Sequence, residues 1–172
     1  MILSLVFITD EIASTISIQF QSNIINDFFV NNLNMSYGEG LSLFSALGFI
    51  TYPISLLMVL YRPLADRFGR KPFLIINTFC MALGLFIVYL SREIVVYMIG
   101  GTLMGFMVSH DMQAVYILEC SNEKTRARNY SIVKAVAILG TLLIPLLRTT
   151  LMQNVSSRWH LVYLVPAIIG FI

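Results

Sequence analysis

The stretch PLADRFGRKP, residues 63–72, lies between two long apolar runs and carries four charged side chains. Charge this dense must lie in water at a membrane surface, because ionised groups are costly in hydrocarbon. Gly69 within the stretch allows a tight turn that a side chain would obstruct. The stretch therefore predicts an exposed loop that joins two membrane-spanning helices.

The composition also indicates a membrane protein. The 172 residues are 58% hydrophobic and 12% charged, with a mean hydropathy of +0.82. A soluble domain carries about 25% charged residues, so this chain fits a lipid bilayer better than water. The net charge of +2 gives no indication of nucleic-acid binding, because the basic residues lie in short loops. The N-terminus lacks the basic region of a cleavable signal peptide.

Five apolar segments are long enough to cross a bilayer, which takes about 20 predominantly apolar residues. They are residues 2–30, 41–61, 73–90, 94–118 and 130–152. A sixth begins near residue 159 and reaches the last residue, 172, after a rise of only about 21 Å. The sequence predicts an all-α membrane helix bundle in which residues 1–172 form one six-helix domain with a truncated sixth helix.

The loops differ in charge, and this predicts the orientation. The loops after spans 41–61 and 94–118 contain Arg62, Arg67, Arg70, Lys71, Lys124, Arg126 and Arg128. The opposite loops contain only Arg92 and Arg158. The positive-inside rule places the first set, and with it the N-terminus, in the cytoplasm of a multi-pass protein of the cell membrane.

The first span is unusually polar. Its apolar residues form a stripe with a spacing of four, namely Ile12, Ile16, Phe20, Ile24 and Phe28. We expect lipid to contact only this stripe, and the polar remainder to face protein or a water-filled cavity. An alternative is that residues 12–30 form an amphipathic helix on the membrane surface.

Two further patterns concern packing. Gly100, Gly101 and Gly105 have the spacing of small residues that allows close helix contact. Lys134 and Arg148 lie near opposite ends of span 130–152, and we expect both side chains to extend to the membrane interfaces.

Residues 64–71, Leu-Ala-Asp-Arg-Phe-Gly-Arg-Lys, resemble the signature loop between helices 2 and 3 of the major facilitator superfamily of secondary transporters. All eight match in order, and Arg62 stands in place of the glycine that opens the family pattern. The resemblance implies that the chain is the N-terminal six-helix half of a twelve-helix transporter whose C-terminal half is absent. The departure at Arg62 puts the close contact of that helix with the other half in doubt.

A second motif resembles the end of helix 4 in the sugar-porter branch of that family. Tyr116, Glu119 and Arg126 match its spacing, whereas Ser121-Asn122 stands where the branch has proline. The resemblance implies a cytoplasmic charge network in which Glu119 pairs with Arg70, and Arg126 with a nearby acid. The expected latch comprises Leu64, Asp66, Arg67, Gly69, Arg70, Lys71, Glu119 and Arg126.

Four ionisable residues are expected deeper in the membrane. Asp10 and His110 each lie about 13 Å along a helix from the inner surface, in helices that line the central cavity of this family. We expect Asp10 or Glu11 to face His110 or Asp111. A carboxylate in a low-dielectric site can hold a proton at physiological pH, and histidine titrates in the same range. The alternative is that Asp10 only anchors the helix at the interface.

Polar residues of the first span are candidates for the substrate cavity, namely Gln19, Gln21, Asn23 and Asn26. The sequence has no phosphate-binding glycine loop and no cluster of metal ligands, since Cys80 and Cys120 are far apart. We expect no cofactor, no metal and no enzymatic activity.

The predicted function is secondary active transport of a small polar solute, such as a sugar or an organic acid. The expected mechanism is alternating access of two halves, with protons as the co-transported partner in symport. The alternatives are a proton-coupled efflux antiporter for drugs or metabolites, and a membrane sensor or binding component built on a transporter-like scaffold.

Overall fold

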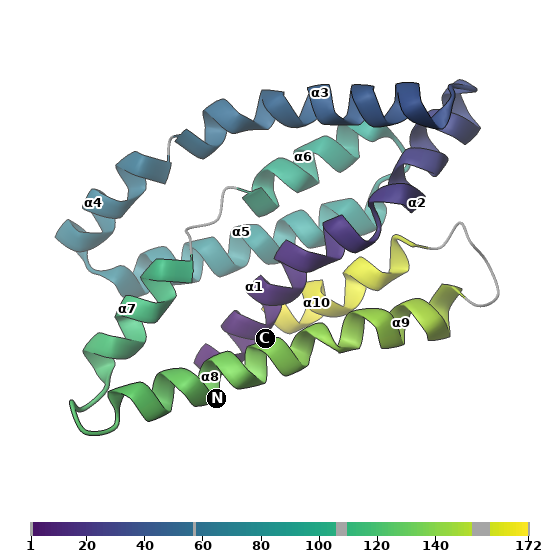
Figure 1. Cartoon of the computed structure of the whole chain (residues 1–172). Helices are drawn as coiled ribbons and strands as arrows, with labels where there is room; N and C mark the ends of the chain where they lie inside the picture. Colours follow the sequence, from purple (N-terminus) through teal and green to yellow (C-terminus); the bar gives the residue numbers. More distant parts are fainter. Residues whose placement is uncertain (1, 57, 106–109, 153–158, 172) are drawn as a thin grey trace.

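The computed structural model describes residues 2–56, 58–105, 110–152 and 159–171, and within these ranges every regular element is a helix (Figure 1). The side chains of a few helical residues, His110 and Asp111 among them, lie outside the described part. The observed helices follow the predicted spans closely, and within the described residues the first span is interrupted at Phe20 and the fifth at Leu142.

The first span consists of three segments, α1 (Ile2–Gln19), α2 (Gln21–Ile25) and the π-helical turn η1 (Asn26–Asn31). The break between α1 and α2 is at Phe20, whose φ and ψ are −102° and 5°. The wider turn of η1 places one extra residue in the helix, a feature that is frequent at functional sites.

Residues 63–72 are helical except for Gly69, so the expected loop at these residues is wrong. The second span comprises α3 (Tyr37–Leu56) and α4 (Met58–Phe68), and α5 (Arg70–Leu90) follows at once. Only Gly69 lies between α4 and α5, with a φ of 92° and a ψ of 144°. Contact with water does not end a helix, whereas glycine favours such an end and can take a positive φ.

The remaining spans begin close to the predicted positions. The fourth comprises α6 (Ile94–Gly105) and α7 (His110–Cys120), and the fifth comprises α8 (Arg126–Thr141) and α9 (Leu143–Met152). The last is α10 (Leu161–Phe171). The fifth span thus begins four residues before the predicted residue 130, a shift of about 6 Å along the helix.

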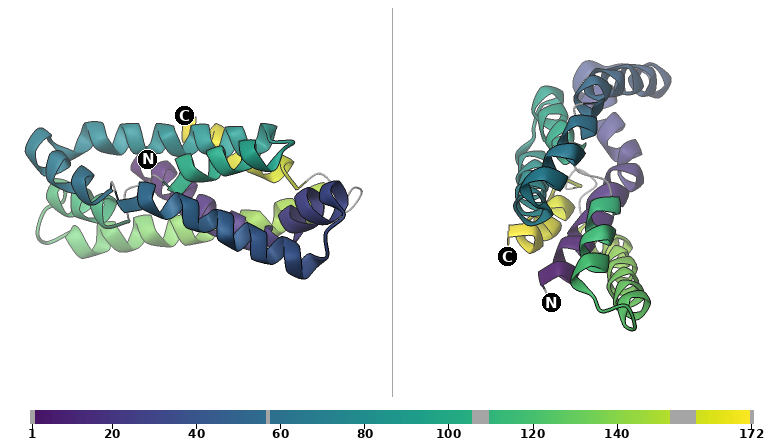
Figure 2. Two further views of the ribbon diagram at one scale, coloured as in Figure 1. Left: turned by 90° about the horizontal axis from the view of Figure 1, so that it is seen from above. Right: turned by 90° about the vertical axis from the view of Figure 1, so that its left-hand side faces the viewer.

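The helices form two layers that are seen edge-on in the right-hand view of Figure 2. In one layer α5 packs between α6 and α10, and in the other α1 packs against α8. Helix α1 joins the layers, because it also contacts α10 and α5. Helices α3 and α4 run across one side of both layers (Figures 1 and 2).

The apolar stripe of the first span lies in the core, so the expected contact of this stripe with lipid is wrong. All five of its residues are at most 4% exposed and belong to one hydrophobic cluster that also contains Trp159 and Tyr163. Polar and other residues on the opposite side of the helix are exposed instead, including Ser14, Ser22 and Asn26. The polar side of the first span therefore lies at the surface of this bundle.

One close helix contact involves a glycine that sequence reasoning missed. A Cβ atom added to Gly84 would lie 2.8 Å from the carbonyl oxygen of Gly100. A Cβ atom added to Gly100 would lie 2.9 Å from the carbonyl oxygen of Gly84. Among the described residues, no atom lies within 4 Å of a Cβ added at Gly101 or Gly105. The expected role in close packing is confirmed for Gly100 and wrong for the other two in this structure.

Judged by length and composition alone, two helices among the described residues are long and apolar enough to cross a membrane. They are Arg70–Leu90 and the continuous run Arg126–Thr150, and shorter apolar helices are Ile94–Gly105 and Leu161–Phe171. Large apolar side chains such as Ile75, Phe79 and Leu142 are exposed on the two long helices. Such surfaces suit hydrocarbon, which is the solvent that a spanning helix contacts.

Candidate functional site

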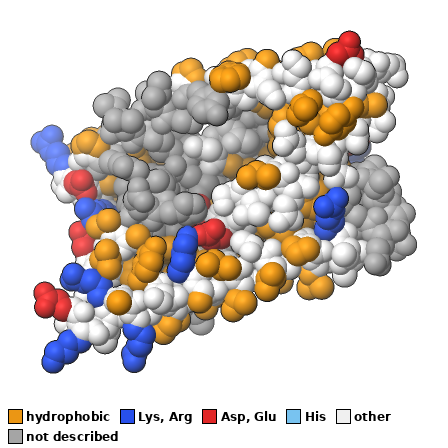
Figure 3. Space-filling model, viewed as in Figure 1, with side chains coloured by type: hydrophobic (Ala, Val, Ile, Leu, Met, Phe, Trp, Pro, Cys, Tyr) orange, Lys and Arg blue, Asp and Glu red, His pale blue; other side chains and the backbone are white. Residues whose placement is uncertain are grey.

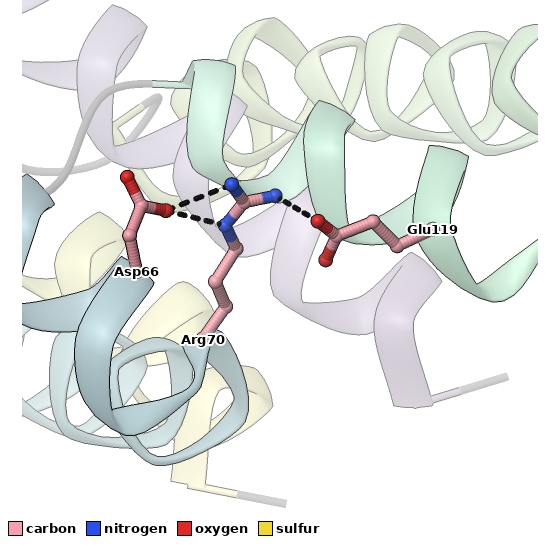
Figure 4. A network of polar contacts seen from close by, with 3 residues as sticks. All are labelled: Asp66, Arg70 and Glu119. Carbon is pink, nitrogen blue, oxygen red and sulfur yellow. Dashed lines mark hydrogen bonds and ion pairs between the residues drawn. The ribbon is translucent and has the colours of Figure 1, made fainter.

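Three charged side chains join the ends of three helices (Figure 4). Arg70, the first residue of α5, donates from Nε and Nη2 to Oδ1 of Asp66 on α4, over 3.0 and 2.8 Å. Its third nitrogen, Nη1, donates to Oε1 of Glu119 on α7 over 2.6 Å. All three guanidinium nitrogens are thus bound, and the predicted pairing of Arg70 with Glu119 is present in the structure.

A small apolar cluster supports this network. Ala65 is fully buried against Leu74 of α5, and Tyr61, Phe73 and Tyr116 pack around them. The hydroxyl of Tyr61 donates to the carbonyl oxygen of Phe73 over 3.3 Å. The cluster thus packs apolar residues of α4, α5 and α7 together next to Asp66.

The other residues of the expected latch are exposed. Leu64, Arg67 and Lys71 extend into the surroundings of the bundle, as does Arg126 at the start of α8. Among the described residues Arg126 has no ion-pair partner, so its expected acid is not found there. Whether the network acts as a latch stays a prediction, and we refer to Asp66, Arg70 and Glu119 as the charged-end network.

A second charged group lies partly buried between α1 and α8. Nζ of Lys134 on α8 donates to Oε1 of Glu11 on α1, and both side chains are largely buried. Asp10, the neighbour of Glu11, is buried as well. In Figure 3 a basic and an acidic side chain adjoin in the middle of one face, while most other charges gather at one end. We call Glu11 and Lys134 the interior pair.

Lys134 is a partner of Glu11 that the sequence did not indicate, and the expected pairing with His110 or Asp111 stays a prediction. The side chains of His110 and Asp111 lie outside the described residues, whereas Lys134 is within bonding distance of Glu11. The expectation that Lys134 extends to the membrane interface is wrong. The fifth span starts at Arg126, so Lys134 lies about 12 Å from the start of its helix. Glu11 lies about 13 Å from the start of α1, which is a similar depth.

The four cavity candidates surround the break in the first span. Asn26 is exposed, and Gln19, Gln21 and Asn23 are partly buried. Oδ1 of Asn23 is buried and accepts no hydrogen bond within the described part of the chain. These residues offer amide donors and acceptors to a ligand, and their role stays a prediction.

A polar contact that the sequence did not indicate joins η1 to the start of α10. Nε1 of Trp159 donates to Oδ2 of Asp27 over 3.0 Å. Asp27 also lines a cavity of about 410 Å³ with Tyr89, Arg92 and His160 among others. The two residues are 132 positions apart, and no pattern in the sequence links them.

The described residues contain no group of three or more histidine, cysteine, aspartate or glutamate side chains that could hold a metal ion. The chemistry that these residues offer is therefore ion pairing, proton binding and hydrogen bonding.

An all-α bundle with exposed apolar side chains on its two long helices fits a polytopic membrane protein. The family model described as Major Facilitator Superfamily matches residues 5–172. The chain belongs to this superfamily, whose members are transporters rather than enzymes. Comparison with curated proteins and with solved structures finds no match.

Proposed function

We propose that the chain is the N-terminal half of a secondary transporter that moves a small polar solute together with protons by alternating access. The observation that carries this proposal is the interior pair. An ion pair in a membrane bundle is costly to maintain and marks a functional site by default. The solute site is expected between two halves near the middle of the membrane, as in related architectures.

The interior pair links a proton to a helix contact. When Glu11 binds a proton it becomes neutral and no longer neutralises Lys134, so the α1–α8 contact weakens. Entry of the proton from one side and its release to the other then couples the pair to a change of conformation. Asp10, His110 and Asp111 remain candidates for the proton path, and Gln19, Gln21, Asn23 and Asn26 for hydrogen bonds to the solute.

The charged-end network has a different proposed role, as a latch between conformations. It holds α4, α5 and α7 together through exposed groups that can separate at little cost. Most of the Lys and Arg side chains on the face shown in Figure 3 lie at one end, which supports a cytoplasmic position of that end in the cell membrane by the positive-inside rule. The exposed residues Leu64, Arg67 and Lys71 are free to contact a second half.

The experiment uses the full-length protein in proteoliposomes. Uptake of a solute panel is measured with and without an inward proton gradient, for the wild type, Glu11→Gln and Glu123→Gln. Glu123 is an exposed acid outside the network, so its variant controls for the loss of one charge. We expect gradient-driven uptake by the wild type and the control, and its loss in Glu11→Gln.

Uptake that is unchanged by collapse of the gradient would contradict proton coupling. Equal uptake by Glu11→Gln and the control would remove the interior pair from the mechanism.

A further inference from the structure

A polar cavity of about 410 Å³ lies at the end of the bundle opposite the charged-end network. It is lined by Asp27 and Asn32 at the end of the first span, by residues 89–92 and by His160. Residues 89 and 90 end α5, whose 21 residues begin at Arg70 of the network and rise about 30 Å. This distance equals the hydrocarbon thickness of a bilayer, so the cavity lies at the other membrane face, which the proposed orientation makes the outer one. Its volume is in the range of small-molecule sites, about 300–1,000 Å³.

The carboxylate of Asp27 is held in place but is only half used. Nε1 of Trp159 donates to its Oδ2 over 3.0 Å, and the side chain of Trp159 is buried in the hydrophobic cluster. Oδ1 accepts no hydrogen bond within the described part of the chain. An acceptor that is fixed beforehand binds a ligand at a lower cost in entropy. Asp27 therefore offers a preorganised oxygen to the cavity.

Arg92 brings a positive charge to the same cavity. Its side chain is exposed, and among the described residues it forms no ion pair, with Asp27 or with any other acid. The guanidinium presents its N–H donors in a fork that matches the two oxygens of a carboxylate. The cavity thus holds one acid and one base that do not neutralise each other directly.

The other charges of the molecule do not enter this balance. Asp10 and Glu11 precede Asp27 by 17 and 16 residues, which is about 25 Å along the first span, and Lys134 is bound to Glu11. His160 also lines the cavity, and a histidine is mostly neutral at about pH 8. At that pH the described lining has a net charge of zero, with the two signs on separate side chains.

These charges select the ligand. An anion that reaches Arg92 also meets the carboxylate of Asp27, and a cation that reaches Asp27 meets the guanidinium, so a ligand of either single charge is disfavoured. A molecule with both an ammonium and a carboxylate group satisfies both side chains. The ring of Tyr89, whose centroid lies 6.3 Å from that of His160, adds an aromatic surface that attracts an ammonium group.

We propose that this cavity binds a small zwitterion of the amino-acid type, with its ammonium group on Oδ1 of Asp27 and its carboxylate on Arg92. The amide of Asn32 supplies further hydrogen bonds. The cavity lies at one membrane face, whereas the proposed solute site lies near the middle of the membrane. Binding in the cavity therefore goes beyond the proposed function and needs neither proton coupling nor a change of conformation.

The test measures thermal unfolding of the full-length protein at about pH 8, where histidine is mostly neutral, in nanodiscs of phosphatidylglycerol. The probes are L-alanine, L-leucine and L-phenylalanine. Each is compared with its analogue without the ammonium group (propionate, 4-methylpentanoate, 3-phenylpropionate) and without the carboxylate (ethylamine, 3-methylbutylamine, 2-phenylethylamine). We expect at least one amino acid to raise the Tm and to bind about tenfold or more tightly than both of its analogues, since each analogue lacks one charge-assisted contact.

Two variants separate the two charges. Asp27→Asn keeps an oxygen that can accept from Trp159 but removes the charge, and it should weaken binding of the amino acid by about tenfold or more. Arg92→Gln should lower the affinity for the amino acid to that for its amine analogue. Glu93→Gln is the matched control, because Glu93 is exposed beside Arg92 but does not line the cavity, and it should bind like the wild type.

Circular dichroism of each variant checks that the fold is retained. If Asp27→Asn does not fold, Arg92→Gln still tests the proposal, because the side chain of Arg92 is exposed and holds no described element in place.

Several outcomes would overturn the proposal. They are no Tm shift with any of the three amino acids, equal shifts with an amino acid and its analogues, or unchanged binding by both Asp27→Asn and Arg92→Gln. A larger shift with D-glucose than with the amino acids would assign the cavity to a neutral polar ligand.

A further arm adds phosphatidylethanolamine without amino acid, because its headgroup also carries an ammonium group and an acidic group. Stabilisation by this lipid that Asp27→Asn abolishes would assign the cavity to a lipid headgroup instead. Amino-acid binding that depends on Asp27 and Arg92, together with no uptake of any solute under a proton gradient, would refute the proposed function and leave this inference intact.

Discussion

The charged-end network and the interior pair use the same side-chain chemistry in different surroundings. The two acids of the network, Asp66 and Glu119, are 61% and 55% exposed at the side chain and Arg70 is 22% exposed. In the interior pair the acid, Glu11, is only 16% exposed and Lys134 is 30% exposed. Exposed ion pairs contribute about 0–1 kcal/mol to stability, because water and salt screen them. Loss of one partner from a buried pair leaves an uncompensated charge and costs several times more. The comparison suggests that the exposed network suits repeated opening, and that the interior pair suits a response to protonation.

The largest effect is expected from breaking the interior pair on one side only. Lys134→Met leaves Glu11 partly buried without its cation, at a cost on the order of 3 kcal/mol. The double variant Glu11→Gln with Lys134→Met removes both charges and should recover much of this loss. Thermal unfolding of the purified full-length protein measures both variants. A double variant that is no more stable than Lys134→Met would show that the pair is not coupled in this way.

The next effect concerns the close contact between α5 and α6. A Cβ atom at Gly100 would lie 2.7 Å from Cγ2 of Val88 and 2.9 Å from the Gly84 carbonyl oxygen. Gly100→Ala should therefore destabilise the protein by about 1–3 kcal/mol through overpacking. Gly101→Ala is the matched control, since among the described residues no atom lies within 4 Å of its added Cβ. Equal Tm values for the two variants would contradict the observed contact.

The charged-end network should respond weakly in stability. Asp66→Asn and Glu119→Gln are each expected to cost about 0.2–1 kcal/mol, as exposed pairs do. Their effect should appear instead in the rate of transport, because the network joins three helix ends. Unfolding and uptake are measured on the same preparations. A loss of stability as large as that of Lys134→Met would erase the distinction between the two regions.

The smallest effect concerns a carboxylate outside both clusters, at the N-terminus of α3. The backbone N–H and the hydroxyl of Ser36 donate to Oε2 of Glu39, over 3.0 and 2.8 Å. The backbone hydrogen bond, followed by that of the hydroxyl, lowers the pKa of Glu39 from 4.5.

A lowered folded-state pKa means that this capping interaction is complete above about pH 4.5 and is lost as the pH falls through the lowered value. The protection of the amides of residues 37–40, which is their exchange rate relative to that of an unstructured chain at the same pH, should fall below that pH in the wild type. Ser36→Ala should show low protection at every pH, and wild-type protection that does not change with pH would contradict the cap.

The sequence was sufficient for much of the fold. The apolar runs gave the positions of the helices within a few residues, because each spanning segment must satisfy its own backbone hydrogen bonds. The pairing of Arg70 with Glu119 could be predicted from the two motifs that carry these residues. The helical state of residues 63–68 could not, since charge density indicates contact with water and says nothing about the backbone.

The interior pair was beyond sequence reasoning for a physical reason. Glu11 and Lys134 are 123 positions apart, and only the packing of α1 against α8 makes them neighbours. An error of four residues in the start of the fifth span was enough to place Lys134 at the interface. Gly84 was missed in the same way, because its close contact depends on the neighbouring helix rather than on its own spacing.

The central claim is that the interior pair couples protons and the charged-end network does not. The most direct test compares gradient-driven accumulation with equilibrium exchange of the same solute, for Glu11→Gln and Asp66→Asn in the full-length protein. We predict that Glu11→Gln keeps exchange and loses accumulation, whereas Asp66→Asn slows both in proportion. If the ratio of accumulation to exchange rate in Glu11→Gln equals that of the wild type, the claim is contradicted.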